Sequence, residues 1–259
     1  AGINSSHGEY IAFLDSDDWV TPDCYEYMLR LAVANQADMS DIMIYQVKSE
    51  QDQIPAVEEK IEVYTGRDIL EHYMYRGMSE QNGAPYSACR KLYKRELLSD
   101  DTANFVEGTV NEDICFNFRI LRKCSKIVVS NQIKYLYFQG EDSITNGAMK
   151  KKDLALLTVS HDLVELAEES GDKKIIELAK MKEARSDFSL LARAAKDGID
   201  ENSIESPDEL LEELRRRLRK NLMLLLRSPM SFARKVLVVA FATNYRLSKK
   251  MLQMLHVLN

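Results

Sequence analysis

The chain has 259 residues, of which 45% are hydrophobic and 29% are charged, as in an ordinary globular protein with a real core. Its longest apolar run, VLVVAFA at 236–242, is too short to cross a bilayer by itself. The four cysteines form no C-x-x-C pair and the four histidines form no H-x-x-x-H pair, which argues against the common zinc sites and predicts buried, reduced thiols in a cytosolic protein.

Charge is distributed unevenly along the chain. The formal net charge is −6, but the segment from Leu214 to Asn259 contains eleven lysines and arginines and no acidic residue. The remainder carries 24 basic and 41 acidic side chains, a net charge of −17. An acidic body with a basic tail suggests two separate tasks.

The first half of the chain alternates short apolar runs with helical patterns. EYIAFL at 9–14 predicts a buried strand, and Thr21 followed by Pro22 predicts a helix that continues to about Asn35. DIMIYQV at 41–47 predicts a second strand, and the polar stretch that follows, to residue 63, predicts a loop. The face assigned to the first helix contains Tyr25, Met28, Leu29, Ala32 and Val33.

Further elements follow in the same style. Thr65 should cap a short helix over 66–77, and Asn111 should cap another that runs to about residue 124. KIVVS and IKYLYF, between residues 126 and 138, predict two strands. The alternation predicts an α/β layer, and we place its end at residue 146.

The second half has a different composition. Glycine and proline become scarce after about residue 150, and amphipathic patterns predict helices. A serine–proline start at 206–207 begins a basic helix, which Pro229 should break before a last one. We therefore expect a helical extension over 147–206 and a basic amphipathic tail over 207–259.

Three carboxylates crowd directly behind the first strand, in the sequence DSDD. Asp15, Asp17 and Asp18 would lie past the carboxyl end of that strand, where open α/β sheets bind ligands. Hard oxygen ligands suit Mg²⁺ or Mn²⁺, which also bind a substrate's phosphates. The alternative is a solvated acidic turn whose charges favour the dipole of the next helix, and D-x-D by itself does not decide between them.

The wider context resembles a known family. GINSSHGEYIAFLDSDDWVTPDCYEYML, together with VNEDICFN around residue 112, is similar to the central segments of family 2 glycosyltransferases. The resemblance covers about residues 1–146 and implies a GT-A, Rossmann-like fold. The family's opening strand, with its apolar-Pro-x-Tyr-Asn pattern, is absent, so we expect an N-terminally truncated domain that binds nucleotide poorly by itself.

The resemblance also implies roles for individual residues. Asp15 and Asp17 would hold Mn²⁺ or Mg²⁺, and with Asp18 they would bind the nucleotide-sugar. Asp113 would be the catalytic base, and Glu112 would orient it or the acceptor. The alternative for this second pair is two acids in the first turn of a helix that only favour its dipole.

Several neighbouring residues have open interpretations. Of the family's later Tyr-x-Tyr-Arg and Ser-Ile pattern, the chain keeps Tyr135, Tyr137, Ser143 and Ile144, and has Phe138 and Gln139 where a basic residue is common. The two tyrosines fit a site or plain strand packing. Trp19 fits sugar stacking or, somewhat better, packing under the loop. Lys91 and Arg95 fit phosphate contacts, although surface exposure is the default for both.

These features predict a glycosyltransferase, inverting, that moves a sugar from a metal-bound UDP-sugar to an acceptor hydroxyl in cell-surface polysaccharide or glycolipid synthesis. It would act in the cytoplasm at the inner face of the membrane. One alternative is another metal-dependent nucleotidyltransferase, for which we find no glycine-rich phosphate loop. The other is an inactive fragment that only binds a membrane or a partner through its helices.

The basic tail has two interpretations of its own. Residues 208–259 interleave Arg and Lys with Leu, Val, Phe and Met, which favours contact with an anionic membrane surface. Packing of this helical pair on the acidic body is the alternative. Nucleic acid is a poor fit because the net charge of the body would repel phosphates. The sequence leaves the oligomeric state open.

Overall fold

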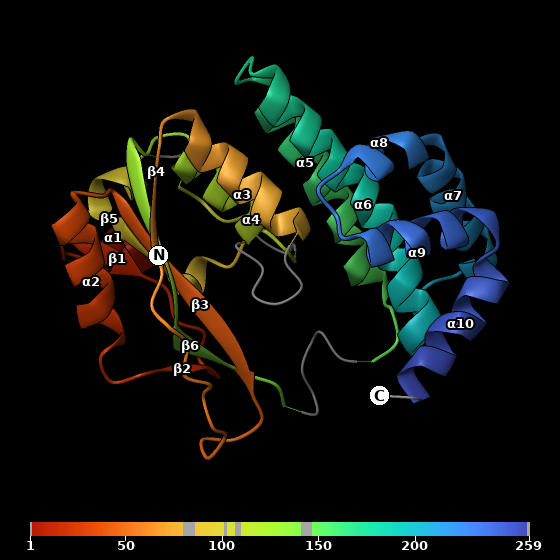
Figure 1. Ribbon diagram of the computed structural model, residues 1–259, viewed down its shortest axis with the longest axis horizontal. Coiled ribbons are helices and arrows are strands. Elements are labelled where there is room, and N and C mark those ends of the chain that lie inside the picture. The colour runs from red at the N-terminus through yellow and green to blue at the C-terminus, as the bar shows by residue number, and fades with distance from the viewer. Residues whose placement is uncertain (1, 80–85, 101–102, 107–109, 141–146, 258–259) are drawn as a thin grey trace. The chain divides into compact units, whose positions relative to one another are not determined.

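A computed structural model describes residues 2–79, 86–100, 103–106, 110–140 and 147–257 (Figure 1). The chain divides into two compact units, one formed by Ala1–Phe105 with Asp113–Ile144 and the other by Val106–Glu112 with Thr145–Asn259. Within the described part of the chain, no helix combines the length and the hydropathy that crossing a membrane requires.

The first unit is built on a six-stranded mixed sheet of order β1-β5-β3-β6-β2, with β4 also paired to β6. Among the described strands of this sheet, β3 and β6 run parallel and the other pairs are antiparallel. The strands are β1 Tyr10–Ala12, β2 Trp19–Val20, β3 Met39–Val47, β4 Ile61–Thr65, β5 Lys91–Lys94 and β6 Lys126–Phe138. Its α-helices are α1 Gly2–Ser5, α2 Cys24–Asn35, α3 Arg67–Ser79 and α4 Asp113–Leu121.

The sheet differs from the predicted one in two places. β6 is one long strand where two were predicted, and register shifts opposite it, around Met43 of β3, let the pairing continue. β4 lies partly inside the predicted loop. Its Ile61 and Val63 side chains are exposed, so the stretch lacks the buried alternation that identifies a strand.

Helix α2 begins later than predicted, and its buried face is shifted. Asp23, not Thr21, occupies the N-cap position, and the Thr21 hydroxyl donates to the Asp23 carboxylate at 2.8 Å. The core face consists of Cys24, Tyr27, Met28, Leu31 and Ala32. Of the predicted face, Met28 and Ala32 are therefore correct, whereas Tyr25, Leu29 and Val33 are exposed.

The cysteine prediction is confirmed for burial. All four thiols are buried and free. Burial raises the pKa of Cys24 to about 11 and that of Cys124 to about 12, which keeps both protonated at neutral pH. They behave as small apolar core residues.

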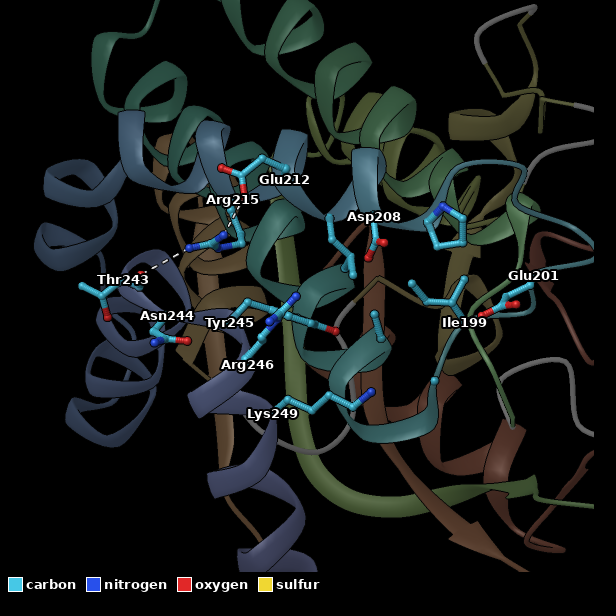
Figure 2. Close-up of a pocket in the computed structure, with 14 residues that line it drawn as sticks. Ile199, Glu201, Asp208, Glu212, Arg215, Thr243, Asn244, Tyr245, Arg246 and Lys249 are labelled. Carbon is cyan, nitrogen blue, oxygen red and sulfur yellow. Dashed lines mark hydrogen bonds and ion pairs between the residues drawn. The ribbon is translucent and has the colours of Figure 1, made fainter.

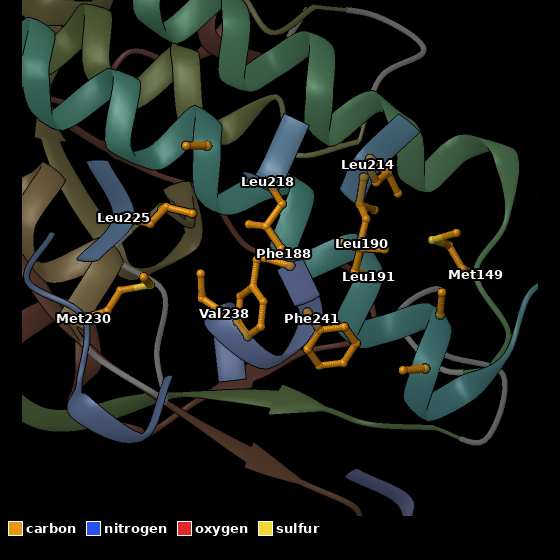
Figure 3. Packing of buried hydrophobic residues seen from close by; sticks show 14 of the residues in the cluster. Met149, Phe188, Leu190, Leu191, Leu214, Leu218, Leu225, Met230, Val238 and Phe241 are labelled. Carbon is orange, nitrogen blue, oxygen red and sulfur yellow. The ribbon is translucent and has the colours of Figure 1, made fainter. Parts of the chain in front are cut away.

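The second unit is helical, and one apolar cluster joins its parts (Figure 3). Its helices are α5 Ala155–Glu168, α6 Lys173–Asp197, α7 Pro207–Lys220, α8 Leu222–Arg227, α9 Phe232–Thr243 and α10 Tyr245–Val257. Phe188 of α6 and Phe241 of α9 meet edge to face with ring centroids 5.8 Å apart. The basic tail contains four helices rather than the two predicted, because the chain also breaks at Asn221 and Asn244.

Basic side chains of α7 hold the end of α9. Arg219 Nε donates to the carbonyl of Ala242 at 2.7 Å, and Arg215 donates to that of Thr243 at 3.2 Å. These carbonyls belong to the last turn of α9, where the helix leaves acceptors unpaired and its dipole favours a cation. Part of the basic tail therefore serves the packing of the helical unit.

A buried carboxylate lies between α6 and α7. Asp187 is fully buried, and Arg217 Nε lies 2.9 Å from its Oδ1 as an ion pair that lacks the angle of a hydrogen bond. Burial raises the pKa of Asp187 to about 6 against the lowering effect of Arg217. The folded state therefore holds this proton at pH values where the unfolded chain has lost it.

This carboxylate should make stability depend on pH. Because the folded state binds more protons between about pH 4 and pH 6, the free energy of unfolding should fall as pH rises through that window. Asp187→Asn should remove this term, so thermal unfolding of the variant should lose less stability than the parent between pH 4 and pH 7. Asp162→Asn on α5 is the control, and a pH profile unchanged by Asp187→Asn would contradict the assignment.

Candidate active site

The register of β1 against β5 determines where the first acidic motif lies. Ala12 pairs with Leu92 in this antiparallel ladder. Asp15 is three residues beyond Ala12 and Cys89 is three residues before Leu92, so the pairing brings the acidic loop to the turn that precedes β5. The Cys89 thiol lies close enough to Asp15 and Tyr135 for both side chains to affect its pKa.

The second acidic motif reaches the same turn. Asp113 is the first residue of α4, and its Oδ2 accepts a hydrogen bond from the Ala88 amide at 3.1 Å. The pKa of the Cys89 thiol is raised to about 12, mainly by burial and in part by the negative charges of Asp15 and Asp113. A single thiol therefore experiences carboxylates from both motifs, which lie about a hundred residues apart in the sequence.

A buried asparagine that the sequence analysis missed positions α4. Asn117 is fully buried, and its Oδ1 accepts from the Tyr93 hydroxyl at 2.6 Å. Its Nδ2 donates to the carbonyls of Tyr86 at 2.5 Å and Asp113 at 3.0 Å. The available signal was a polar residue on an otherwise apolar helical face, four residues after Asp113.

The three aspartates of the first motif are not equivalent. Asp18 is only 9% exposed; its Oδ2 accepts from the Tyr135 hydroxyl at 2.6 Å and its Oδ1 from the Phe138 amide at 2.8 Å. The same hydroxyl accepts from the Asp15 amide at 3.3 Å. Burial raises the pKa of Asp18, the two hydrogen bonds oppose this, and the charges of Asp15 and Asp17 add to it.

Asp15 and Asp17 are exposed, and neither they nor Asp18 form a salt bridge in the described part of the chain. No set of three or more His, Cys, Asp and Glu side chains among the described residues is arranged to hold a metal ion. Two exposed carboxylates nevertheless suit Mg²⁺ or Mn²⁺, which bind through one or two protein carboxylates and take further ligands from water and substrate phosphates.

A buried ion cluster adjoins the site, and the sequence analysis did not foresee it. Arg90 Nε lies 2.5 Å from Asp41 Oδ1 on β3, and Lys91 Nζ lies 3.9 Å from Asp41 Oδ2. Lys91 Nζ also donates to the Ser87 carbonyl at 2.8 Å. Lys91 is 1% exposed, so the expectation of surface exposure is wrong for it; Arg95 is exposed, as expected.

The reason for the burial of Lys91 is its partner across the sheet. Asp41 and Lys91 are paired residues in the β3–β5 ladder, which puts opposite charges side by side in the interior. A charged residue in a strand is buried only when it is paired, and the pairing becomes visible only once the register is known.

The remaining candidate residues from the sequence analysis differ in how they are placed. The rings of Trp19 and Phe138 lie 5.7 Å apart in a tilted arrangement, so the residue found where a basic one is common packs against this tryptophan. Tyr135 does more than pack, because its hydroxyl joins Asp18 to the Asp15 backbone. Tyr137 is half-buried, and Ser143 and Ile144 lie outside the described residues. Glu112 is grouped with the helical unit, and its role stays a prediction.

A hollow of about 800 Å³ lies wholly in the helical unit (Figure 2). None of the predicted site residues lines it. Its lining includes acidic Asp208 and Glu212 and basic Arg215, Arg246 and Lys249, and Arg215 pairs with Glu212 at 2.6 Å. Of the predicted site residues, Asp15, Asp17, Asp18 and Asp113 lie in the first unit, and Glu112 is grouped with the helical unit but does not line this hollow.

Comparison with known proteins agrees with the fold and the motifs. Residues 1–101 match the model of the family "Glycosyl transferase family 2". Glycosyltransferase GlyA of Streptococcus pneumoniae is 27% identical over 176 residues, which is 66% of this chain and 25% of that protein. Putative glycosyltransferase EpsH of Bacillus subtilis is 31% identical over 121 residues, 46% of this chain and 34% of that protein.

A third relative, cholesterol galactosyltransferase of Borreliella burgdorferi, is 26% identical over 165 residues, 61% of this chain and 46% of that protein. The chain spans less than half the length of each of these relatives. Among solved structures, Staphylococcus aureus TarS 1–349 in complex with UDP-GlcNAc aligns with a TM-score of 0.55 at 15% identity, covering 97% of this chain and 70% of that one.

The fold is that of an α/β GT-A domain followed by a helical extension, which confirms the predicted fold class. Residues 1–101 match glycosyltransferase family 2, the family that the sequence resembles, and the relatives described above are named glycosyltransferases.

The Tyr135 hydroxyl should stabilise the first unit measurably. Tyr135→Phe removes the donor to Asp18 and leaves a buried carboxylate oxygen without its partner, which should cost about 1–3 kcal/mol in urea unfolding. Tyr137→Phe, on the same strand and half-buried, is the control and should change the free energy of unfolding little. Equal losses in the two variants would mean that the Tyr135–Asp18 bond contributes nothing specific.

Proposed function

We propose that the protein containing this chain transfers a sugar from a metal-bound nucleotide-sugar, a UDP-sugar, to an acceptor hydroxyl. The observation that carries the proposal is that both motifs reach the turn before β5: Asp113 accepts a hydrogen bond from the Ala88 amide, and Asp15, of the exposed acidic pair, affects the pKa of the neighbouring Cys89 thiol. The match of residues 1–101 to glycosyltransferase family 2 supports the reaction class. The UDP-GlcNAc complex of TarS, which shares the fold, supports the class of donor.

The acidic loop would bind the donor's diphosphate through a divalent cation. Asp15 and Asp17 are the residues to hold it, since they are exposed and lack a protein countercharge in the described part of the chain. A bound Mn²⁺ or Mg²⁺ would offset the charge of the departing diphosphate. Asp18, predicted to share in donor binding, would act indirectly by anchoring the loop to Tyr135 and the Phe138 amide.

Asp113 would accept the proton of the acceptor hydroxyl. In an inverting displacement the acceptor oxygen bonds to the anomeric carbon, the bond from that carbon to the diphosphate breaks, and the proton passes to the Asp113 carboxylate. The Ala88 amide holds Oδ2 in place through this step. Glu112 would orient Asp113 or the acceptor. General-base assistance of this kind accelerates a reaction about 10²–10⁴-fold.

The acceptor would be a carbohydrate or a lipid-linked sugar of cell-surface polysaccharide or glycolipid synthesis. A relative named cholesterol galactosyltransferase supports a lipid acceptor. Synthesis would take place in the cytoplasm at the inner face of the membrane, with peripheral contact through residues 208–259. No observation favours the nucleotidyltransferase alternative.

Replacement of the proposed base should abolish most of the transfer. In the whole protein, Asp113→Asn should lower kcat by at least about 10²-fold without a matching change in the KM for donor, measured as UDP release from a panel of UDP-sugars with Mn²⁺. The carboxamide keeps an acceptor for the Ala88 amide but takes up no proton.

Asp68→Asn is the matched control, because Asp68 is likewise an acidic residue in the first turn of a helix, α3. If Asp113 only favours the helix dipole, the two variants should behave alike, with turnover near that of the parent. Intact turnover in Asp113→Asn would refute the proposed base.

A further inference from the structure

The helical unit uses some of its basic side chains internally and leaves others unpaired. Arg215, Arg217 and Arg219 of α7 contact carboxylates or helix-end carbonyls. In the described part of the chain, six later cations have neither a salt bridge nor a hydrogen-bond acceptor: Lys220, Arg227, Lys235, Arg246, Lys249 and Lys250. No acidic residue follows Glu213 in the sequence. Positive charge here therefore has no counterpart within its own segment.

Helix α9 is apolar on two opposite sides. Val238, Phe241 and Ala242 are buried in the core of the helical unit. Phe232, Val236 and Val239 are 81%, 48% and 38% exposed.

These three exposed residues follow one another at intervals of four and three, so they share one helical face. Lys235 lies at the edge of this face on a helical projection. A surface helix of a globular protein normally has one apolar stripe, and the second one here needs a partner.

We propose that this exposed face of α9 (Phe232, Val236 and Val239) docks on an anionic lipid bilayer, with Arg227 and Lys235 against the headgroups. This proposal rests on the proposed function, which supplies the reason for docking: a lipid-linked acceptor would be presented at the bilayer surface. An interfacial helix buries its apolar face at the boundary between headgroups and acyl chains. Each basic residue near an anionic bilayer strengthens binding about fivefold.

Charge favours lipid over a protein partner. The six cations named above have no carboxylate partner in the described part of the chain, so a purely apolar protein surface would leave their charge uncompensated. An anionic bilayer supplies both an apolar layer and a continuous negative surface. A second copy of this chain, through its acidic body, is the competing occupant, and the experiment separates the two.

The test is flotation of the full 259-residue chain with two kinds of vesicle, phosphatidylcholine alone and phosphatidylcholine with about one-third phosphatidylglycerol. The chain should float with the anionic vesicles and stay behind with the neutral ones. The triple variant Phe232→Ser, Val236→Ser, Val239→Ser should lose at least about tenfold in partitioning. The pair Arg227→Gln, Lys235→Gln, which keeps the apolar face, should lose about 30-fold on anionic vesicles.

The matched control is Tyr25→Ser, Leu29→Ser, Val33→Ser on α2, three exposed apolar residues at helical spacing that should leave flotation unchanged. Circular dichroism establishes that each variant is folded. Failure of the parent to float with anionic vesicles, or equal flotation of the parent and the α9 triple variant, would overturn the proposal. So would a loss of self-association in the triple variant, by sedimentation, without loss of flotation.

The proposed function can be tested independently of membrane docking, because transfer by the whole protein to a water-soluble acceptor requires no membrane. Flotation that depends on the α9 face in a protein without transferase activity would support the docking and refute the function. Transfer without flotation would support the function and refute the docking.

Discussion

The pairing of β1 with β5 is the constraint on which the candidate site depends. With Ala12 fixed opposite Leu92, the residues beyond one strand lie against the residues before the other. The acidic loop thereby reaches Cys89, and the neighbouring Ala88 amide holds Asp113 at the start of α4. A slip of one residue would turn each side chain of the short β1 strand to the opposite face of the sheet and separate the two motifs.

The three aspartates of the acidic loop lie close together in sequence, but one is buried and two are exposed to water. Asp18 turns inward, where Tyr135 and the Phe138 amide compensate for its burial. Asp15 and Asp17 stay in contact with water, which screens their repulsion. The repulsion between the two exposed carboxylates costs free energy, which a bound cation would offset. This need for a cation links the geometry of the loop to the proposed metal-assisted sugar transfer.

The sequence predicted those features that local patterns encode, such as the strand before DSDD and the helix that begins near Asp113. It missed those that depend on pairing across the sheet. The burial of Lys91 beside Asp41 follows from the β3–β5 register, and the different environment of Asp18 follows from β6. β4 escaped detection because its apolar side chains are exposed, so its residues have no buried alternation. Local propensity carries no information about such distant partners.

The account's central claim is that Asp15 and Asp17 on one side and Asp113 on the other face a common site for a cation and a sugar. Anomalous diffraction at the manganese edge, from crystals of the protein grown with Mn²⁺ and UDP, tests it directly. We predict one Mn²⁺ ion bound by the carboxylates of Asp15 and Asp17, with the Asp113 carboxylate facing the same solvent-filled space next to Cys89. An ion bound elsewhere, or packed side chains between these carboxylates, would contradict the account.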